Sequence, residues 1–327
     1  MNEVNLTPVP MRYSGFRLRT PAQVWAGSYG TLPEKALLLS ALLNQAGIPA
    51  CPAAVLRASA YDGRIADLSG IEEMIVKAEI PGGDVMWLSA AALNPQDLSR
   101  TLDGKVAVCF TGNGKVAETK MDAKEAGVTL KGNLFVSDKN EMTGEVSASL
   151  TGPANPQYAL KRDSEKARQW FAGGVASRDL KDAKFSQAGP ESANFAFDIK
   201  KENALKKDSI LRIFTLPSLT AGAESWNLKL LPSYRNSPLE VPFALAETTE
   251  LTVTLPDGMT MITPENEFNI SNAAGSFRFV LKKEAGKIVV SRELKIPSRI
   301  IEPGNYQAFK TLLDNYNDPR NRDILLR

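Results

Sequence analysis

A leucine-rich helix predicted at residues 33–46 constrains the fold of this chain more than any other segment. Apolar side chains cover most of its circumference, which is typical of an element buried on several sides. Thr31 and Glu34 have the spacing of a capping box, Pro33 suits the first turn, and Gly47 ends the helix. Such a helix is stable only against another layer of structure, which the following segments must supply. The apolar positions are Leu37, Leu38, Leu39, Leu42 and Leu43.

Short strand candidates follow this helix and predict an α+β first part. Each is an apolar or alternating run between turn residues, at 53–56, 74–80, 85–88 and 105–110. We predict that residues 1–110 form one domain, with the helix packed on a small sheet. The chain starts abruptly before what resembles mid-domain sequence, so we expect this domain to lack its natural beginning.

From residue 111 onward, alternating strands and turn residues dominate. Asn113 and Gly114 suit a tight hairpin, and apolar positions alternate over 128–136. These patterns predict a β-sandwich-like domain at 111–245. It contains one inserted helix, which opens at Asn155-Pro156, carries Leu160, Ala167, Trp170 and Phe171, and ends before Gly173-Gly174.

The last segment, 246–327, is predicted to be a separate β-rich domain that ends in a helix. Hairpin-like runs at 268–270, 276–282 and 287–295 indicate the strands. A helix from about Gly304 to Leu313 places its apolar side chains on one face. These are Tyr306, Phe309 and Leu313.

The charge balance limits the classes of partner. Lys and Arg total 39 against 37 Asp and Glu, so no global field attracts nucleic acid or anionic lipid. We interpret the lysine pairs at 200–201 and 206–207 as a solvated face. No apolar run approaches the ~20 residues of a membrane span, and the first residues lack an export signal. Cys51 and Cys109 lie in apolar runs, so we expect buried thiols rather than a disulfide.

No metal or cofactor site is predicted. Zinc is disfavoured because the 327 residues contain no histidine and only two distant cysteines. Residues 314–318 superficially resemble a calcium loop but lack its glycine and closing glutamate, so we predict a helix end and a turn. Residues 112–115 lack the spacing and the hydroxyl residue of a phosphate-binding loop.

Three motifs at 12–110 are similar to the transglutaminase-like core, a relative of the papain fold found in bacterial envelope proteins. They are RTPAQVW at 19–25, GTLPEKALLLSALL at 30–43 and AGIPA at 46–50. The segments beyond 110 resemble, more weakly, the β-rich domains that accompany this core. The resemblance implies an α+β fold: a degenerate transglutaminase-like domain followed by β-sandwich-like domains.

The resemblance also implies a triad that this sequence has changed. A helix N-terminus favours a cysteine thiolate, a histidine takes its proton, and a carboxylate orients the histidine. Leu32 stands at the cysteine position, Glu73 aligns with the histidine and Ser89 with the aspartate. Cysteine–histidine catalysis by this chain is therefore excluded on composition, unless a partner supplies residues.

Other interpretations of the residues expected near these triad positions stay open. Glu34 and Glu73 could form a carboxylate pair, although we favour Thr31 as a helix cap with Glu34 as its partner. Trp25, Tyr29 and Trp87 could stack a sugar or a peptide, although packing is the commoner use of such residues.

The leading hypothesis is a non-catalytic binding or scaffolding protein of the bacterial periplasm or envelope. Its ligand would be a peptide, a protein or a glycan. The alternatives are a transglutaminase- or peptidase-like hydrolase with a substituted active site, and a glycan-binding module.

Overall fold

The computed structural model divides the chain into two compact units, Met1–Ala123 and Lys124–Arg327. The first boundary therefore lies beyond the predicted 110, because β7 (Val116–Lys120) completes the sheet of unit 1. The residues that the structure describes are 3–10, 13, 17–65, 68–80, 82–91, 98, 102–110, 116–122, 124–155, 184–189, 192–228 and 231–327.

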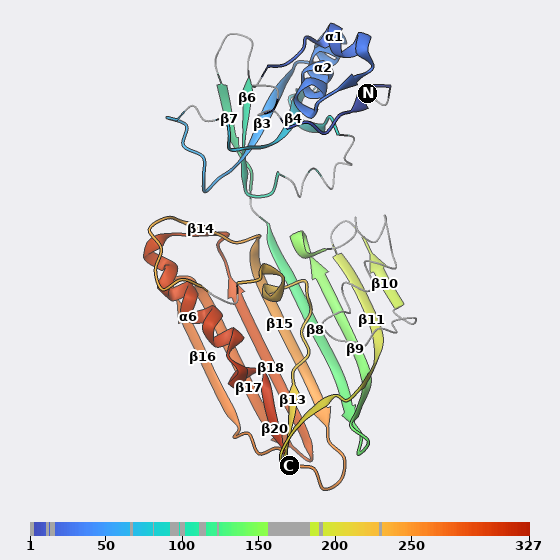
Figure 1. The fold of residues 1–327 in the computed structure, drawn as a ribbon, viewed down its shortest axis with the longest axis vertical. Coiled ribbons are helices and arrows are strands. Elements are labelled where there is room, and N and C mark those ends of the chain that lie inside the picture. The colour runs from blue at the N-terminus through green and yellow to red at the C-terminus, as the bar shows by residue number, and fades with distance from the viewer. Residues whose placement is uncertain are drawn as a thin grey trace. The chain divides into compact units, whose positions relative to one another are not determined.

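Unit 1 packs helix α2 on one face of a five-stranded antiparallel sheet, in the α+β arrangement predicted for it (Figure 1). The strand order is β5-β4-β3-β6-β7. A two-residue parallel pair lies outside this sheet. The elements are β1 (Asn5–Leu6), α1 (Pro21–Gly27), β2 (Tyr29–Gly30), α2 (Leu32–Gln45), β3 (Ala50–Arg57), β4 (Ile71–Glu79), β5 (Val85–Ser89), β6 (Lys105–Phe110) and β7.

The predicted helix is confirmed, but it is buried mainly in its first half. Ala36 and Leu38 are almost fully buried, whereas Leu42 is 36% exposed. The helix meets the sheet on Met74, Val76 and neighbouring apolar side chains. The prediction of burial around most of the circumference is wrong for the second half, because the described sheet covers only one side of the helix.

The prediction of free thiols is also wrong, because Cys51 and Cys109 form a disulfide. Their Cα atoms are 6.1 Å apart, although the residues are 58 positions apart in sequence. The two cysteines lie on the paired strands β3 and β6, where Ala53 is opposite Cys109. The bond faces the side of the sheet away from α2, among Val55, Ile75 and Trp87.

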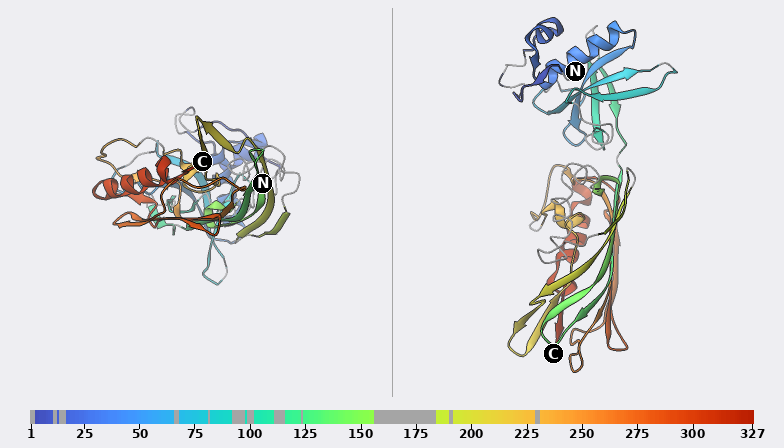
Figure 2. Two further views of the ribbon diagram at one scale, coloured as in Figure 1. Left: turned by 90° about the horizontal axis from the view of Figure 1, so that it is seen from below. Right: turned by 90° about the vertical axis from the view of Figure 1, so that its right-hand side faces the viewer.

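Unit 2 is built on one eight-stranded sheet, which Figure 2 shows as a single layer. The order is β10-β11-β9-β8-β15-β18-β17-β16. Its strands are β8 (Glu125–Val136), β9 (Glu141–Thr151), β10 (Lys184–Ala188), β11 (Ser192–Glu202), β15 (Ala244–Thr254), β16 (Asn266–Asn272), β17 (Gly275–Glu284) and β18 (Lys287–Ile296).

The predicted boundary at 245/246 is wrong because β15 joins the two predicted domains. This strand pairs in parallel with β8 and antiparallel with β18 over nearly its whole length. The other neighbours in the sheet are antiparallel, so two four-stranded halves meet at the β8–β15 pair. One core of apolar side chains runs across both halves.

The second layer of unit 2 is mixed, which differs from the β-sandwich-like domain that the sequence predicted at 111–245. Helix α6, a three-stranded sheet and short 3-10 turns pack on one face of the large sheet (Figures 1 and 2). The elements are η2 (Gly152–Ala154), β12 (Leu205–Asp208), β13 (Leu211–Thr215), η3 (Ala223–Trp226), β14 (Leu239–Glu240), β19 (Ile300–Ile301), η4 (Pro303–Asn305), α6 (Tyr306–Asn317), η5 (Pro319–Asn321) and β20 (Asp323–Leu326).

The closing helix is confirmed, although it begins at Tyr306 and ends at Asn317 rather than running from Gly304 to Leu313. Tyr306, Phe309 and Leu313 are buried on one face of α6, as the spacing indicates. The predicted helix after Asn155 and the Asn113-Gly114 turn lie outside the described residues.

Candidate functional site

A cavity of about 500 Å³ lies at the N-terminal end of α2, at the place of the expected triad. Most of its lining is apolar, and Glu72 and Glu73 are its acidic members. Its walls come from the segment before α1, the first turn of α2 and the start of β4. The lining residues are Leu6, Thr7, Pro8, Val9, Pro10, Leu32, Pro33, Leu68, Ser69, Ile71, Glu72, Glu73 and Met74.

Leu32 occupies the first position of α2 and lines this cavity, as the motif predicts. Thr31 before it has the extended backbone of an N-cap, and Pro33 sits in the first turn. The Leu32 side chain also packs on the apolar cluster between α2 and the sheet. A leucine cannot act as a nucleophile, so this position can contribute only shape and apolar contact.

Glu73 lines the same cavity from an irregular point in β4. Val55 is opposite Glu73 and Leu56 is opposite Ile71, so Glu72 is an extra residue in the strand. Glu72 forms ion pairs with Arg57 at 3.0 Å and Lys105 at 2.7 Å.

The carboxylate of Glu73 carries an unsatisfied acceptor. Its Oε1 is buried and has no hydrogen-bond partner among the described residues. Burial raises the pKa of Glu73, while the charge of Lys105 and an interaction of the carboxylate with the Met74 backbone amide oppose that rise. A buried acceptor without a donor is costly, so a ligand that donates a hydrogen bond here would be favoured.

Ser89 is not part of this cavity. It is paired with Ile75 on the neighbouring strand, and Leu88 before it packs toward α2. Successive side chains of a strand point to opposite faces, so Ser89 faces away from α2. Its hydroxyl accepts a hydrogen bond from the Ala91 amide at 3.1 Å. The structure therefore brings Leu32 and Glu73 to one cavity and directs Ser89 elsewhere.

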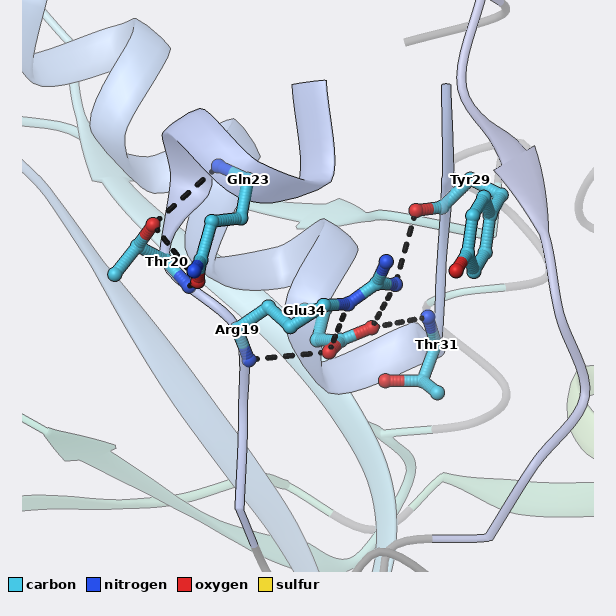
Figure 3. A network of polar contacts seen from close by, with 6 residues as sticks. All are labelled: Arg19, Thr20, Gln23, Tyr29, Thr31 and Glu34. Atoms are coloured by element: carbon cyan, nitrogen blue, oxygen red, sulfur yellow. Dashed lines mark hydrogen bonds and ion pairs between the residues drawn. The ribbon is translucent and has the colours of Figure 1, made fainter. Parts of the chain in front are cut away.

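Glu34 is held by a network at the start of α2 (Figure 3). The Arg19 guanidinium donates to Oε1 at 2.9 Å and to Oε2 at 2.8 Å, and the Arg19 amide donates to Oε1 at 3.1 Å. The Thr31 amide donates to Oε2 at 2.9 Å. The hydrogen bonds from Arg19, and then that from the Thr31 amide, lower the pKa of Glu34 to about 2 against the cost of burial.

This network gives Glu34 a local structural role. The same guanidinium donates to the Tyr29 carbonyl at 3.0 Å and lies over the Tyr29 ring at 4.3 Å. Glu34 therefore ties the segment before α1 and the loop after it to the start of α2. Because four donors hold its oxygens, the carboxylate is not available for the pair with Glu73 that the sequence left open.

The predicted capping-box arrangement of Thr31 and Glu34 is present, but its two halves differ in strength: the Thr31 amide donates to Glu34 at 2.9 Å, whereas the Thr31 hydroxyl faces the Glu34 amide without full hydrogen-bond geometry. The Thr31 hydroxyl faces the first turn, but it is buried and makes no hydrogen bond. In α1 both halves are hydrogen bonds: the Gln23 amide donates to Thr20 Oγ1 at 3.3 Å, and the Thr20 amide donates to Gln23 Oε1 at 2.9 Å.

The three aromatic candidates do not converge on one site. Trp25 and Tyr29 are each 49% exposed, and neither lines the cavity. Trp87 packs beside the disulfide on the opposite face of the sheet from α2. The Tyr29 ring instead packs against the Arg19 guanidinium.

Sequence reasoning missed the segment Glu3–Pro10 and its contact with Lys35. The Lys35 ammonium is buried and donates to the Val4 carbonyl at 2.7 Å. Burial lowers the pKa of Lys35. No local pattern indicates this contact, because the two residues are 31 positions apart.

A second missed cluster is buried between the large sheet and its covering layer in unit 2. Glu247 accepts from the Tyr316 hydroxyl at 2.7 Å and from the Ala223 amide at 2.8 Å. The Arg292 guanidinium lies 4.4 Å from the centre of the Tyr316 ring and donates to the Tyr316 carbonyl at 2.6 Å. Burial raises the pKa of Glu247 and lowers that of Arg292.

The loop at 314–318 is the helix end and turn that the sequence predicts. Asp314 pairs with Lys310 within α6, and Asp318 pairs with Arg320 in η5. Across the described ranges there is no cluster of three or more potential metal ligands. No helix in the described part of the chain is long and apolar enough to cross a bilayer.

Comparison with known proteins identifies a fold and leaves the activity open. Residues 211–326 match a family described as a domain of unknown function with a solved structure (DUF3858). The whole chain is similar to a crystal structure from Parabacteroides distasonis described as a "putative protease". The TM-score is 0.55 at 22% identity, covering 99% of this chain and 49% of that chain. This likeness shows the fold alone, and this chain spans about half of that protein's length. No curated protein matches this chain.

Proposed function

We propose that this chain is a non-catalytic, transglutaminase-like protein whose cavity at Leu32 and Glu73 binds an extended apolar peptide. The observation that carries the proposal is the composition of the cavity. A largely apolar lining surrounds one buried carboxylate oxygen that has no donor. Apolar pockets with a few convergent polar groups are the usual form of a binding site.

The ligand that fits combines an apolar body with a hydrogen-bond donor. Aliphatic contacts are offered by Leu32, Ile71 and Met74, and the donor would meet the Glu73 carboxylate in the cavity wall. A lysine side chain or a backbone amide of a peptide supplies such a donor. A fold shared with a protein described as a "putative protease" also favours a peptide over a sugar.

The residues at the cavity support the part of the proposal that concerns binding without chemistry. Leu32 replaces the nucleophile that the motif would place at the helix N-terminus, and the chain contains no histidine. Thr7 and Ser69 bring hydroxyl groups to the cavity beside Glu73, but neither hydroxyl is hydrogen-bonded to Glu73 Oε1. A hydroxyl of that kind needs a positioned base before it attacks.

A periplasmic or envelope location is part of the same proposal. The Cys51–Cys109 disulfide supports it, because disulfides persist in oxidising compartments and are rare in the cytosol of mesophiles.

Peptide binding to the full chain tests the function. Fluorescent peptides of ten residues, apolar with one central lysine, are titrated against the unmodified chain and the Leu32→Lys variant. We expect the variant to weaken binding by at least about tenfold, because a buried charge would repel the ligand's ammonium and disrupt the apolar wall.

Leu42→Lys is the matched control, since Leu42 lies on the exposed part of the same helix. Equal affinity for the two variants would contradict the proposal. Mass spectrometry of the same peptides checks catalysis: cleavage or transfer that Glu73→Gln abolishes would favour the hydrolase alternative instead.

A further inference from the structure

The segment Glu3–Pro10 has the features of a peptide bound by strand addition. Its strand β1 pairs in parallel with β2, and this two-stranded pair is separate from the main sheet of unit 1. The Asn5 amide donates to the Ser28 carbonyl and the Thr7 amide donates to the Gly30 carbonyl, each at 2.9 Å. Main-chain pairing of this kind is how extended peptides dock on a strand edge.

One side chain and one carbonyl anchor the segment. Val4 is 2% exposed and packs with Val24 and Leu38. The Val4 carbonyl accepts from the buried Lys35 ammonium at 2.7 Å. A buried ammonium requires an acceptor, so Lys35 selects for a backbone carbonyl beside an apolar side chain at this point.

Beyond the anchor, the segment crosses the cavity and is less tightly packed. Leu6 and Val9 are 44% and 40% exposed although both line the cavity wall. Pro8 and Pro10 have no amide hydrogen to donate, and each favours an extended backbone in the residue before it. The apolar side chains over the cavity are therefore much less buried than that of Val4.

We infer that the edge of β2 is a strand-addition site, which Glu3–Pro10 occupies in cis and which an extended peptide of the same chemistry occupies in trans. The inference rests on the proposed function and names its ligand class. The ligand has a β-branched residue at the Val4 position, a carbonyl for Lys35, and an apolar, proline-containing continuation over the Leu32–Glu73 cavity.

The test weakens the cis segment without altering its anchor. Asn5→Pro combined with Thr7→Pro removes both amide donors of β1, while Val4 and Lys35 remain. Asn5→Ala combined with Thr7→Ala is the matched control, because both amides remain. A fluorescent peptide with the sequence of residues 3–10, EVNLTPVP, is titrated against the two full-length variants and the unmodified chain.

We expect the proline variant to bind this peptide at least about tenfold more tightly than the alanine variant, since two hydrogen bonds no longer hold the cis segment in place. A peptide with Asp at the Val4 position should lose this gain, because it would place a charge in the apolar Val4 pocket. Equal affinity for the proline variant, the alanine variant and the unmodified chain would overturn the inference. So would equal binding of the Asp peptide.

Two further measurements keep the result interpretable. Circular dichroism and an intact Cys51–Cys109 bond check that the proline variant folds. Failure of the lysine-containing peptides on the unmodified chain would count against the proposed function. The EVNLTPVP comparison between the proline and alanine variants would still decide the strand-addition site.

Discussion

The start of α2 in unit 1 and the centre of the large sheet in unit 2 each bury one glutamate, with opposite consequences. Glu34 is 5% exposed and Glu247 is 4% exposed. The pKa of Glu34 falls to about 2, whereas that of Glu247 rises. Equal burial therefore does not fix the protonation behaviour of the two groups.

The partners explain the difference. Glu34 receives two guanidinium hydrogen bonds from Arg19, whose side chain stays 32% exposed and solvated. Glu247 receives one amide and one phenol hydrogen, and its nearby cation Arg292 is itself buried. A charge-assisted, bidentate pair favours the ionised form, while desolvation on both sides disfavours it.

The largest effect that would sharpen this comparison comes from Glu247→Ala. We expect a loss of about 3–5 kcal/mol in the free energy of unfolding, because the Ala223 amide and the Tyr316 hydroxyl lose their buried acceptor and the buried Arg292 loses a nearby carboxylate. Urea denaturation measures this loss. The control is Glu250→Ala on the same strand, whose carboxylate pairs with Lys131 at an exposed site. If both variants lost the same small amount, the buried network would not stabilise unit 2.

The second prediction is that loss of the disulfide destabilises unit 1 and leaves unit 2 unchanged. Reduction, or Cys51→Ala with Cys109→Ala, should cost unit 1 about 2–4 kcal/mol, because the bond closes a loop between residues 58 positions apart. Unit 2 contains no cysteine and should be unaffected. Amide hydrogen exchange, measured with and without reductant, gives the exchange rates of both units in one sample. Equal acceleration in both units would argue against a bond confined to unit 1.

The third prediction concerns how the contribution of Glu34 to stability changes with pH. The pKa of Glu34 is lowered on folding, so its contribution is present above about pH 4.5 and is lost as the pH falls toward about 2. Glu34→Gln should remove about 1–2 kcal/mol above pH 5 and little at pH 2. Denaturation curves of both proteins between pH 2 and 7 give this difference.

Glu247→Gln should have the opposite pH dependence. Its pKa is raised on folding, so any contribution is greatest below about pH 4.5 and declines as the pH rises through the folded value. The comparison between the two glutamates would fail if both variants changed stability with the same sign of slope.

The smallest expected effects test how much each N-cap hydroxyl stabilises the two helices of unit 1. Thr20→Ala should cost about 0.5–1 kcal/mol, because its hydroxyl accepts from the Gln23 amide. Thr31→Ala should change stability by less than about 0.5 kcal/mol, because the Thr31 hydroxyl makes no hydrogen bond. Thermal unfolding of the two variants side by side checks this order. The reverse order would restore Thr31 as a cap.

Local sequence determined the elements of this protein. Thr31, Pro33 and Gly47 mark the start and end of α2 within one or two residues of the observed helix. The spacing of Tyr306, Phe309 and Leu313 gives the buried face of α6. These features are readable because caps and periodicity depend on residues only a few positions apart. Leu32 at the helix start could be placed for the same reason.

Tertiary structure alone decided which distant elements meet. Cys51 reaches Cys109 because β3 pairs with β6, and β8 pairs in parallel with β15 so that two predicted domains share one sheet. The strand register also places Ser89 on the face of the sheet away from the cavity that Glu73 lines. Strand partners and register depend on contacts across the whole unit, and a shift of one residue reverses the face of every side chain. For that reason the sequence located the helix start that borders the cavity, while only the packed sheet decided which side chains share it.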